Sequence, residues 1–303
     1  MVDESRADGS RARQMTVDVI VPVYNAEKTI EPCIRSILAA VAGEAGVSII
    51  FVDNGSTDAT MDMIRRDAGA VRLIEAAEKG SYAARNAGAA AGNGDYLLFT
   101  DGDCIVDGAW FRSFVAYLDA TPQARLVAGP IILFDKPGDN RFAVKFEEIF
   151  DFNQAAAVRN NLAMTANLLV SRDLFRAIDG FDARLRSGGD SDFCLRATRH
   201  GATLEYCAEA IVRHPSRGTI GALVAKERRV VGGHWLRYIR SIKQKVLHPF
   251  HVIRYHPRRT RRIMATDLPF ADKLGVEGVS LVITLAAAFE AVRLMLGGEP
   301  RRL

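Results

Sequence analysis

The amino-acid sequence predicts an α/β protein in which helices flank a mostly parallel central sheet. From Val17 onward, short runs rich in β-branched residues alternate with stretches of helical periodicity. Alternation of this kind requires right-handed crossovers, which join parallel strands. The composition agrees, because 49% hydrophobic and 25% charged residues in a chain of 303 are typical of a globular protein. They exclude a disordered, collagen-like or disulfide-rich chain.

The first half of the chain contains the most regular elements. Residues 17–23 (VDVIVPV) predict a buried strand, and residues 27–41 predict an amphipathic helix with isoleucines on one face. The elements expected next are a strand at 48–52, a helix at 59–68, a strand at 71–74, a helix at 82–91 and a strand at 96–100. The second half is less regular. It predicts strands at 126–132 and 167–170, helices at 171–178 and 192–200, and a long basic helical stretch from 217 to about 246.

The modest net charge of +4 conceals a basic segment. Residues 228–266 contain eleven Lys and Arg and no Asp or Glu, so the rest of the chain carries about −7. This segregation indicates different partners for the acidic body and the basic segment. Four cysteines without a CxxC pair favour reduced thiols. Residues 1–14 lack the apolar run of a secretory signal, so we expect a disordered tail and a cytoplasmic protein.

Polar residues follow the first, second and fourth predicted strands, where ligands bind in open α/β sheets. Asp101 and Asp103 are separated by one glycine, and such a pair can converge on a hard cation that also binds diphosphate oxygens. The alternative is an ordinary β-turn.

In the loop that begins at Asp53, one of residues 56–58 is expected to cap the next helix. This would leave Asp53 free for a ribose or a base.

The order of four segments is specific. VIVPVYNAEKTI, FVDNGSTDAT, GSYAARNAG and YLLFTDGDC follow one another, and together they resemble the family 2 glycosyltransferases, which have the GT-A fold. The resemblance runs from about residue 17 to 215. No GxGxxG follows the first strand, so a dinucleotide-binding domain is excluded. A nucleotidyltransferase on a similar sheet, which would release pyrophosphate, is the second enzymatic alternative.

The resemblance implies a nucleotide-sugar donor, Mn²⁺ or Mg²⁺, and inversion at the anomeric carbon. In this family the end of the first strand and the Asp of the loop after the second strand contact the nucleoside. The matching residues here are Pro22, Tyr24, Glu27 and Asp53. Arg85 is placed near the base or the phosphates, Asp101 and Asp103 match the metal motif, and Asp101 also lies by the donor. His214 is a candidate for the metal or the diphosphate, although a lone histidine is more often structural.

The acceptor end resembles the same family at Gly189, Asp190 and Asp192. The family has a Glu-Asp pair here, and Gly189 replaces the Glu. The resemblance implies that Asp190 is the general base that takes the proton of the acceptor hydroxyl. The alternative is that Asp190 caps a helix that starts near Asp192. The missing Glu puts acceptor orientation in doubt.

An apolar stretch at 278–296 lies near the end of the chain. Its charge-free part, 278–289, is too short to span a bilayer, so we expect a helix at the membrane interface or packed on the body rather than a span. Aromatic residues in the basic segment, among them Trp235, favour contact of residues 228–296 with anionic lipid. Trp110 is expected in the core. Nucleic acid is not expected as a partner.

The sequence therefore predicts a disordered tail at 1–14, a GT-A domain at 15–215 and a basic helical extension at 216–303. The expected protein is an inverting, metal-dependent glycosyltransferase on the inner face of the cytoplasmic membrane. UDP is preferred over GDP in the donor, and a glycan or a lipid-linked, phosphorylated molecule is the expected acceptor. The alternative from another class is a catalytically impaired scaffold that binds a nucleotide or a membrane.

Overall fold

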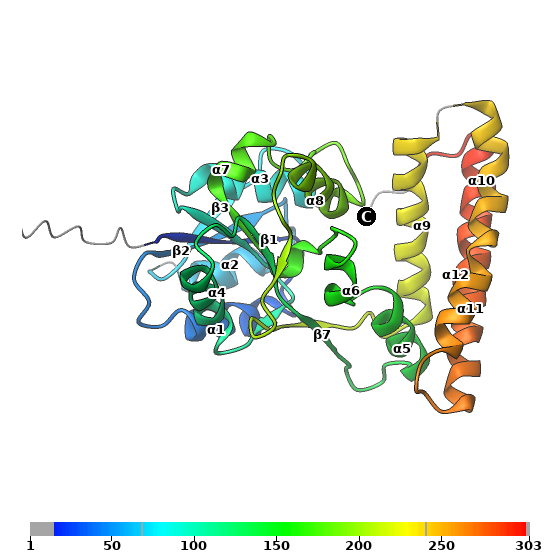
Figure 1. Cartoon of the computed structure of the whole chain (residues 1–303), viewed down its shortest axis with the longest axis horizontal. Helices are drawn as coiled ribbons and strands as arrows, with labels where there is room; N and C mark the ends of the chain where they lie inside the picture. The colour runs from blue at the N-terminus through cyan, green and yellow to red at the C-terminus, as the bar shows by residue number, and fades with distance from the viewer. Residues whose placement is uncertain (1–14, 68, 240, 301–303) are drawn as a thin grey trace, which may run out of the picture.

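An α/β body and a layer of long helices lie side by side in this protein (Figure 1). The computed structural model describes residues 15–67, 69–239 and 241–300. The tail expected at 1–14, the predicted helix end at Ala68 and Arg240 of the basic segment lie outside the described residues.

The centre of the body is a seven-stranded sheet with strand order β3-β2-β1-β4-β8-β6-β9. Its strands are β1 (Val17–Val23), β2 (Val47–Asp53), β3 (Arg72–Glu75), β4 (Tyr96–Phe99), β6 (Leu126–Ala128), β8 (Leu168–Ser171) and β9 (Glu205–Tyr206). The first four are parallel to one another, and only β8 runs antiparallel to its neighbours. The predicted fold class is confirmed, and the ends of β1, β2 and β4 meet at one edge.

Helices cover both faces of this sheet because successive strand residues point to opposite sides. Val19 and Val21 of β1 are fully buried on one face, and Ile20 is fully buried on the other. The first face packs against α1 (Ile30–Ala40), α2 (Thr60–Arg65) and α4 (Trp110–Ala120). The second face packs against α3 (Ser81–Ala91), α7 (Arg172–Ala177) and α8 (Gly189–Arg199). Trp110 is buried in the core, as expected.

The single strand expected at 126–132 is in fact two strands in different sheets. A second, three-stranded sheet contains β5 (Ile105–Val106), β7 (Ile131–Phe134) and β10 (Val212–Pro215). Gly129 and Pro130 separate β6 from β7, because Pro130 has no N–H for a sheet hydrogen bond. A side chain at Gly129 would lie 2.3 Å from the carbonyl oxygen of Ala210, so the backbone passes where only glycine fits.

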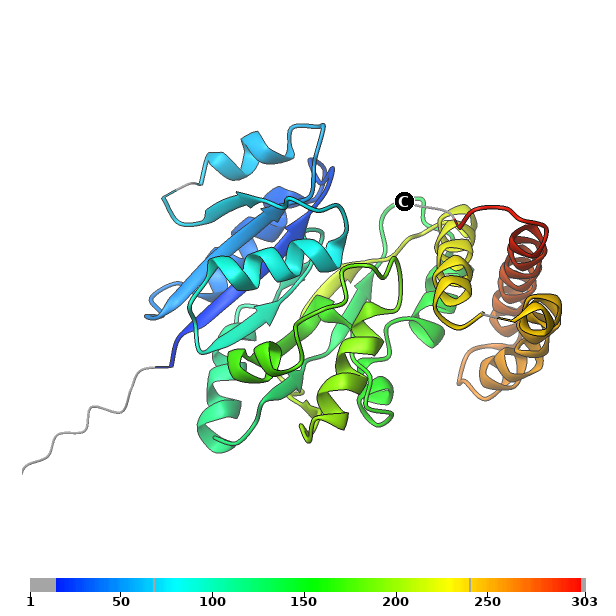
Figure 2. The ribbon, with the colours of Figure 1, turned by 90° about the horizontal axis from the view of Figure 1, so that it is seen from above.

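The four helices that follow β10 in the chain, α9 to α12, form the helical layer. In this layer α9 lies next to the body, and it separates the body from the outer helices α10, α11 and α12 (Figures 1 and 2). The remaining helices of the described chain are α5 (Arg141–Phe150), α6 (Gln154–Val158), the 3₁₀ turn η1 (Thr165–Asn167), α9 (Ile220–Tyr238), α10 (Ile242–Arg254), α11 (His256–Met264) and α12 (Phe270–Met295). The long helix expected at 217–246 is therefore two helices. Ser241 begins α10 with a capping box that includes Gln244.

Candidate active site

The turn after β4 carries the two carboxylates of the DGD segment. Arg85 on α3 forms an ion pair with Asp101 and is itself buried. Burial alone would lower the pKa of Arg85, but the Asp101 and Asp190 carboxylates outweigh it and raise this pKa. Arg85 is therefore a fixed cation between Asp101 and Asp190, which the sequence analysis assigned to the donor end and the acceptor end.

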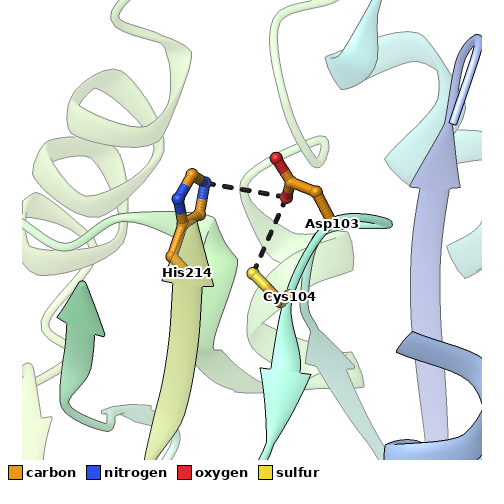
Figure 3. Close-up of side chains that lie close together, drawn as sticks. All are labelled: Asp103, Cys104 and His214. Carbon is orange, nitrogen blue, oxygen red and sulfur yellow. Dashed lines mark hydrogen bonds and ion pairs between the residues drawn. The ribbon is translucent and has the colours of Figure 1, made fainter. Parts of the chain in front are cut away.

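His214 on β10 faces Asp103 across the site (Figure 3), with 3.6 Å between Nε2 and Oδ1. Its Nδ1 lies 2.7 Å from the Pro215 carbonyl oxygen. A carbonyl oxygen can only accept, so Nδ1 carries a hydrogen, and Nε2 is the ring nitrogen that faces Asp103. A hydrogen bond from the second ring nitrogen also orients histidines that bind metals.

The donor atoms around Asp103 fit a divalent cation. Burial raises the pKa of Asp103 and the neighbouring Asp101 adds to this increase, while His214 opposes it. A cation would compensate the two carboxylates. The Cys104 sulfur lies 3.9 Å from Asp103 Oδ1, but burial raises the pKa of this thiol well above its usual range. Because only a thiolate is a good ligand, carboxylate oxygen and imidazole nitrogen remain. The carboxylates suit both Mn²⁺ and Mg²⁺, and the imidazole favours Mn²⁺, the transition metal of the two.

The loops after β1 and β2 are hydrogen-bonded to each other at the same edge. The Asn25 N–H donates to Ser56 Oγ at 2.9 Å. The N-cap of α2 is Ala59 rather than one of residues 56–58, but the Asp58 carboxylate does accept from the N–H of Thr60, the first residue of α2, at 3.0 Å. Asp58 also accepts from the Glu27 N–H, so these polar side chains join the two loops as well, a contact that local sequence does not reveal.

Asp53 lies beneath this pair of loops and is 2% exposed. Its carboxylate accepts hydrogen bonds from the N–H groups of Gly55 at 2.9 Å and Ser56 at 3.0 Å. Asp53 is therefore partly used by the protein backbone, and its further lone pairs leave it able to accept from a ribose or a base. The other residues predicted to contact the nucleoside lie along this edge: Pro22 is half-buried, and Tyr24 and Glu27 are exposed.

Asp190 lies in the first turn of α8, on the other side of Arg85. One of its oxygens accepts from the Thr165 N–H at 3.3 Å, and the other is buried without a hydrogen-bond partner among the described residues. The N-cap of α8 is Gly188, in a left-handed conformation. The alternative that Asp190 caps a helix near Asp192 is therefore wrong. A substrate hydroxyl would satisfy the buried oxygen, which is costly to leave unpaired.

Tyr82 is a residue of this site that sequence reasoning missed. Its hydroxyl accepts from the Gly189 N–H at 2.9 Å. Burial raises the pKa of Tyr82, and the Asp190 carboxylate adds to the effect. A side chain at Gly189 would lie 2.5 Å from the Tyr82 ring. The space expected for a Glu side chain is therefore filled by a tyrosine, and the GSYAARNAG segment was the only signal for it.

The helical layer contacts the acceptor side of the site through α9. Asp192 forms ion pairs with Arg196 at 2.7 Å and with Arg237 of α9. Trp235, expected as a membrane anchor, is half-buried against α12, and its ring centre lies 5.7 Å from that of His248. The extension therefore borders the N-terminal end of α8, which carries Asp190.

Comparisons with known proteins agree with this geometry. Residues 18–176 match the model of glycosyl transferase family 2. Glycosyltransferase AglE of Haloferax volcanii is 33% identical over 222 residues, which cover 72% of each chain. The pre-mycofactocin glycosyltransferase of Mycobacterium tuberculosis is 28% identical over 221 residues, 70% of this chain and 45% of that one.

Two solved structures share the fold at low sequence identity. The mannosyltransferase PcManGT of Pyrobaculum calidifontis, in complex with GDP-Man and Mn²⁺, has a TM-score of 0.60 at 20% identity over 91% of this chain and 86% of that one. S. aureus TarS with UDP-GlcNAc has a TM-score of 0.54 at 14% identity over 95% and 93%. The sheet, the DGD turn at its edge and the family match together show that this chain belongs to glycosyl transferase family 2 and is a GT-A-fold glycosyltransferase.

Proposed function

We propose that this glycosyltransferase is metal-dependent and inverts the anomeric carbon of a nucleotide sugar. The observation that supports this most is the arrangement around Arg85. Asp101 pairs with Arg85 beside Asp103 and His214, and Asp190 interacts with Arg85 from the acceptor side. The carboxylates of Asp101 and Asp190 thus lie on two sides of the Arg85 guanidinium group. This arrangement suits a displacement in which the nucleophile and the leaving group occupy opposite sides of the sugar.

Each centre has a separate part in the proposed reaction. Asp103 and His214 would hold Mn²⁺ or Mg²⁺, with Asp101 beside them, and the cation supplies positive charge to the departing diphosphate. The acceptor oxygen forms a bond to the anomeric carbon as the bond from that carbon to the diphosphate oxygen breaks. Asp190 takes the acceptor proton, and the nucleoside diphosphate leaves with the electron pair of the broken bond.

The nucleoside of the donor would lie along the loops after β1 and β2. Pro22, Tyr24, Glu27 and Asp53 line this edge, and Asp53 is held in place by the loop N–H groups. We propose UDP before GDP as the nucleotide. The two structural neighbours contain GDP-Man and UDP-GlcNAc, so they support a nucleotide sugar in general and leave both bases as arms of the test.

A thermal-shift experiment tests the donor site. We expect one nucleotide, UDP or GDP, to raise the melting temperature only with Mn²⁺, because a ligand that binds only the folded state stabilises it. Asp103→Ala should abolish this shift. If neither nucleotide shifts melting at millimolar concentration, the proposal is wrong and the scaffold alternative gains support. Transfer or hydrolysis of a donor sugar would exclude a scaffold.

For the membrane, we propose that the helical layer binds an anionic lipid surface through the outer face of α12. Large apolar side chains are exposed along the whole length of this helix and at the residue that follows it: Phe270, Leu274, Leu281, Val282, Leu285, Phe289, Val292 and Leu296. The fully exposed stripe contains no charged residue, and basic α10 and α11 pack against α12. Apolar surface beside Lys and Arg is the combination that binds anionic bilayers.

We propose that α12 lies at the interface rather than across the membrane. By its length and apolar composition it could span one, but 44% of its most apolar stretch is buried in the protein. Its inner face buries Ser280, Thr284 and Glu290. Burial acts to raise the pKa of Glu290, but Arg293 and Arg228 hold it below its usual value. An ionised Glu290 paired with Arg228 on α9 fixes this face against the protein.

A further inference from the structure

One cation of the helical layer differs from its neighbours. The four Lys and Arg of α9 are Lys226, Arg228, Arg229 and Arg237. Three of them form ion pairs, Lys226 with Asp151, Arg228 with Glu290 and Arg237 with Asp192. Within the part of the chain that the structure describes, Arg229 forms no ion pair with a carboxylate. Its one hydrogen bond there is from Nη1 to the Arg186 carbonyl oxygen, at 3.4 Å.

Arg229 belongs to the face of α9 that contacts the loop before Asp190. Gly233 lies one turn further along and packs against Ser187, so closely that a Cβ there would lie 2.8 Å from the Ser187 Cβ. Arg237 lies another turn along and pairs with Asp192. Residues four apart lie on one face of a helix. The three contacts therefore direct Arg229 to the acceptor side of the site.

The surroundings of Arg229 leave its charge uncompensated. Burial lowers its pKa; Tyr82 and Asp190 act to raise it but do not outweigh burial, and Arg217 lowers it further. Arg217 itself is paired with the buried Glu147. A partly buried cation without a carboxylate carries a desolvation cost that an anionic ligand would remove. The place for such a ligand is beside Asp190, where the proposed acceptor hydroxyl lies.

We infer that Arg229 binds a phosphoryl group carried by the acceptor, next to the hydroxyl that Asp190 deprotonates. This rests on the proposed function and names the class of acceptor as phosphate-bearing. A guanidinium group can bind two phosphate oxygens in a fixed geometry. The phosphoryl group can be attached to an apolar chain held at the membrane-facing helices or to a soluble sugar, and both offer Arg229 the same chemistry.

Calorimetric titration of the full chain with four probes tests the inference. The probes are citronellyl phosphate (a phosphate on an apolar chain), glucose 1-phosphate, citronellol and glucuronate. We expect a phosphate probe to bind the wild type and Arg229→Gln to weaken it about tenfold or more, the loss of a charged hydrogen bond. Arg229→Lys should retain part of the affinity. Arg199→Gln, which removes an exposed arginine from the far end of α8, should change nothing.

The two phosphate probes distinguish the sources of the phosphoryl group. Binding of citronellyl phosphate alone indicates a lipid-borne phosphate, and equal binding of glucose 1-phosphate indicates a soluble one. Three results would overturn the inference. The Arg229→Gln variant could bind the phosphate probe as tightly as the wild type does, or the wild type could bind no phosphate probe. Glucuronate could also bind as tightly as the phosphate probes, in a manner that depends on Arg229. Metal-dependent nucleotide binding, measured on the same samples, shows that each variant is folded. If the wild type lacks it, the proposed function fails as well.

Discussion

The α/β body and the helical layer both bury apolar side chains, but they differ in how many large apolar side chains they expose. In the body, the large apolar residues of the sheet are buried, as Ile20, Phe51 and Phe99 illustrate with no exposed surface. Among the described residues, twenty large apolar side chains are exposed; only Tyr24 and Ile132 belong to 15–215, and the other eighteen belong to 216–300. The body is therefore suited to water on all sides, and the layer is suited to an apolar neighbour.

The helix α12 shows the difference most clearly. Its outer face is apolar, and its buried face combines Ser280, Thr284 and Glu290 with six apolar residues: Val276, Val279, Ile283, Ala287, Ala291 and Leu294. A helix on the surface of a water-soluble protein has a polar outer face instead. Thr284 Oγ1 donates to the Ser280 carbonyl at 2.8 Å, and Glu290 is paired with two arginines, so the inner polar groups are satisfied within the protein. In the functions proposed above, catalysis belongs to the body and membrane attachment to the layer.

The largest expected effect is on chemistry in the body. Asp190→Asn should lower transfer at least a hundredfold, because a general base contributes about 10²–10⁴ in rate. Nucleotide binding should be unchanged, since Asp190 is hydrogen-bonded to Thr165 and acts on Arg85 only through its charge, and it is not one of the predicted metal ligands. Asp103→Asn should abolish transfer and also weaken nucleotide binding. Steady-state kinetics with thermal shift measure both, and full transfer activity in either variant would remove that residue's role.

A smaller effect is expected on membrane attachment. The double variant Leu285→Glu and Phe289→Glu places charge on the exposed face of α12. It should weaken sedimentation with phosphatidylglycerol vesicles more than tenfold, because each apolar side chain contributes about 1.5–3 kcal/mol when buried. Nucleotide binding should not change. Ile132→Glu, an exposed apolar residue of the body, is the control; if both variants bind vesicles like the wild type, α12 does not face the lipid.

The contact between Tyr82 and Gly189 offers a test of packing inside the body. Gly189→Ala should destabilise the protein by about 1–3 kcal/mol, since the new methyl group would lie 2.5 Å from a buried ring. Combining it with Tyr82→Ala should cost less than the sum of the two single changes, because the clash disappears. Denaturant unfolding measures this. Additive effects would show that the two residues do not compete for the same space.

The smallest expected effect concerns pH and the interface of α9 with α10. Burial lowers the pKa of His248 to about 4, and His234 and His251 add to the shift. The unfolded chain therefore binds a proton between about pH 6.5 and 4 that the folded chain does not, so stability falls as pH falls through this window. The melting temperature should drop by a few degrees from pH 7 to 5. His248→Gln should reduce the drop, and His200→Gln, at an exposed position, should not.

Much of the sheet and its edge could be predicted because the signals are local. The alternation at 17–23 depends only on adjacent residues, and β1 begins and ends as predicted. Parallel strands bring their carboxyl ends together, so Asp53 and the DGD turn fall at one edge without any tertiary information. The strand at 126–132 failed for the opposite reason. Its apolar pattern continues through Gly129 and Pro130, while the two halves pair in different sheets.

The sequence by itself determined the fold class, the family and the carboxylates at Asp101, Asp103 and Asp190, because short-range periodicity and motif order encode them. Only the tertiary structure decided that Tyr82 fills the space beside Gly189, that His214 turns its Nε2 to Asp103, and that α12 exposes an apolar face. Each of these depends on contacts between residues far apart in the chain. Such contacts arise from packing, which leaves no periodic trace in the sequence.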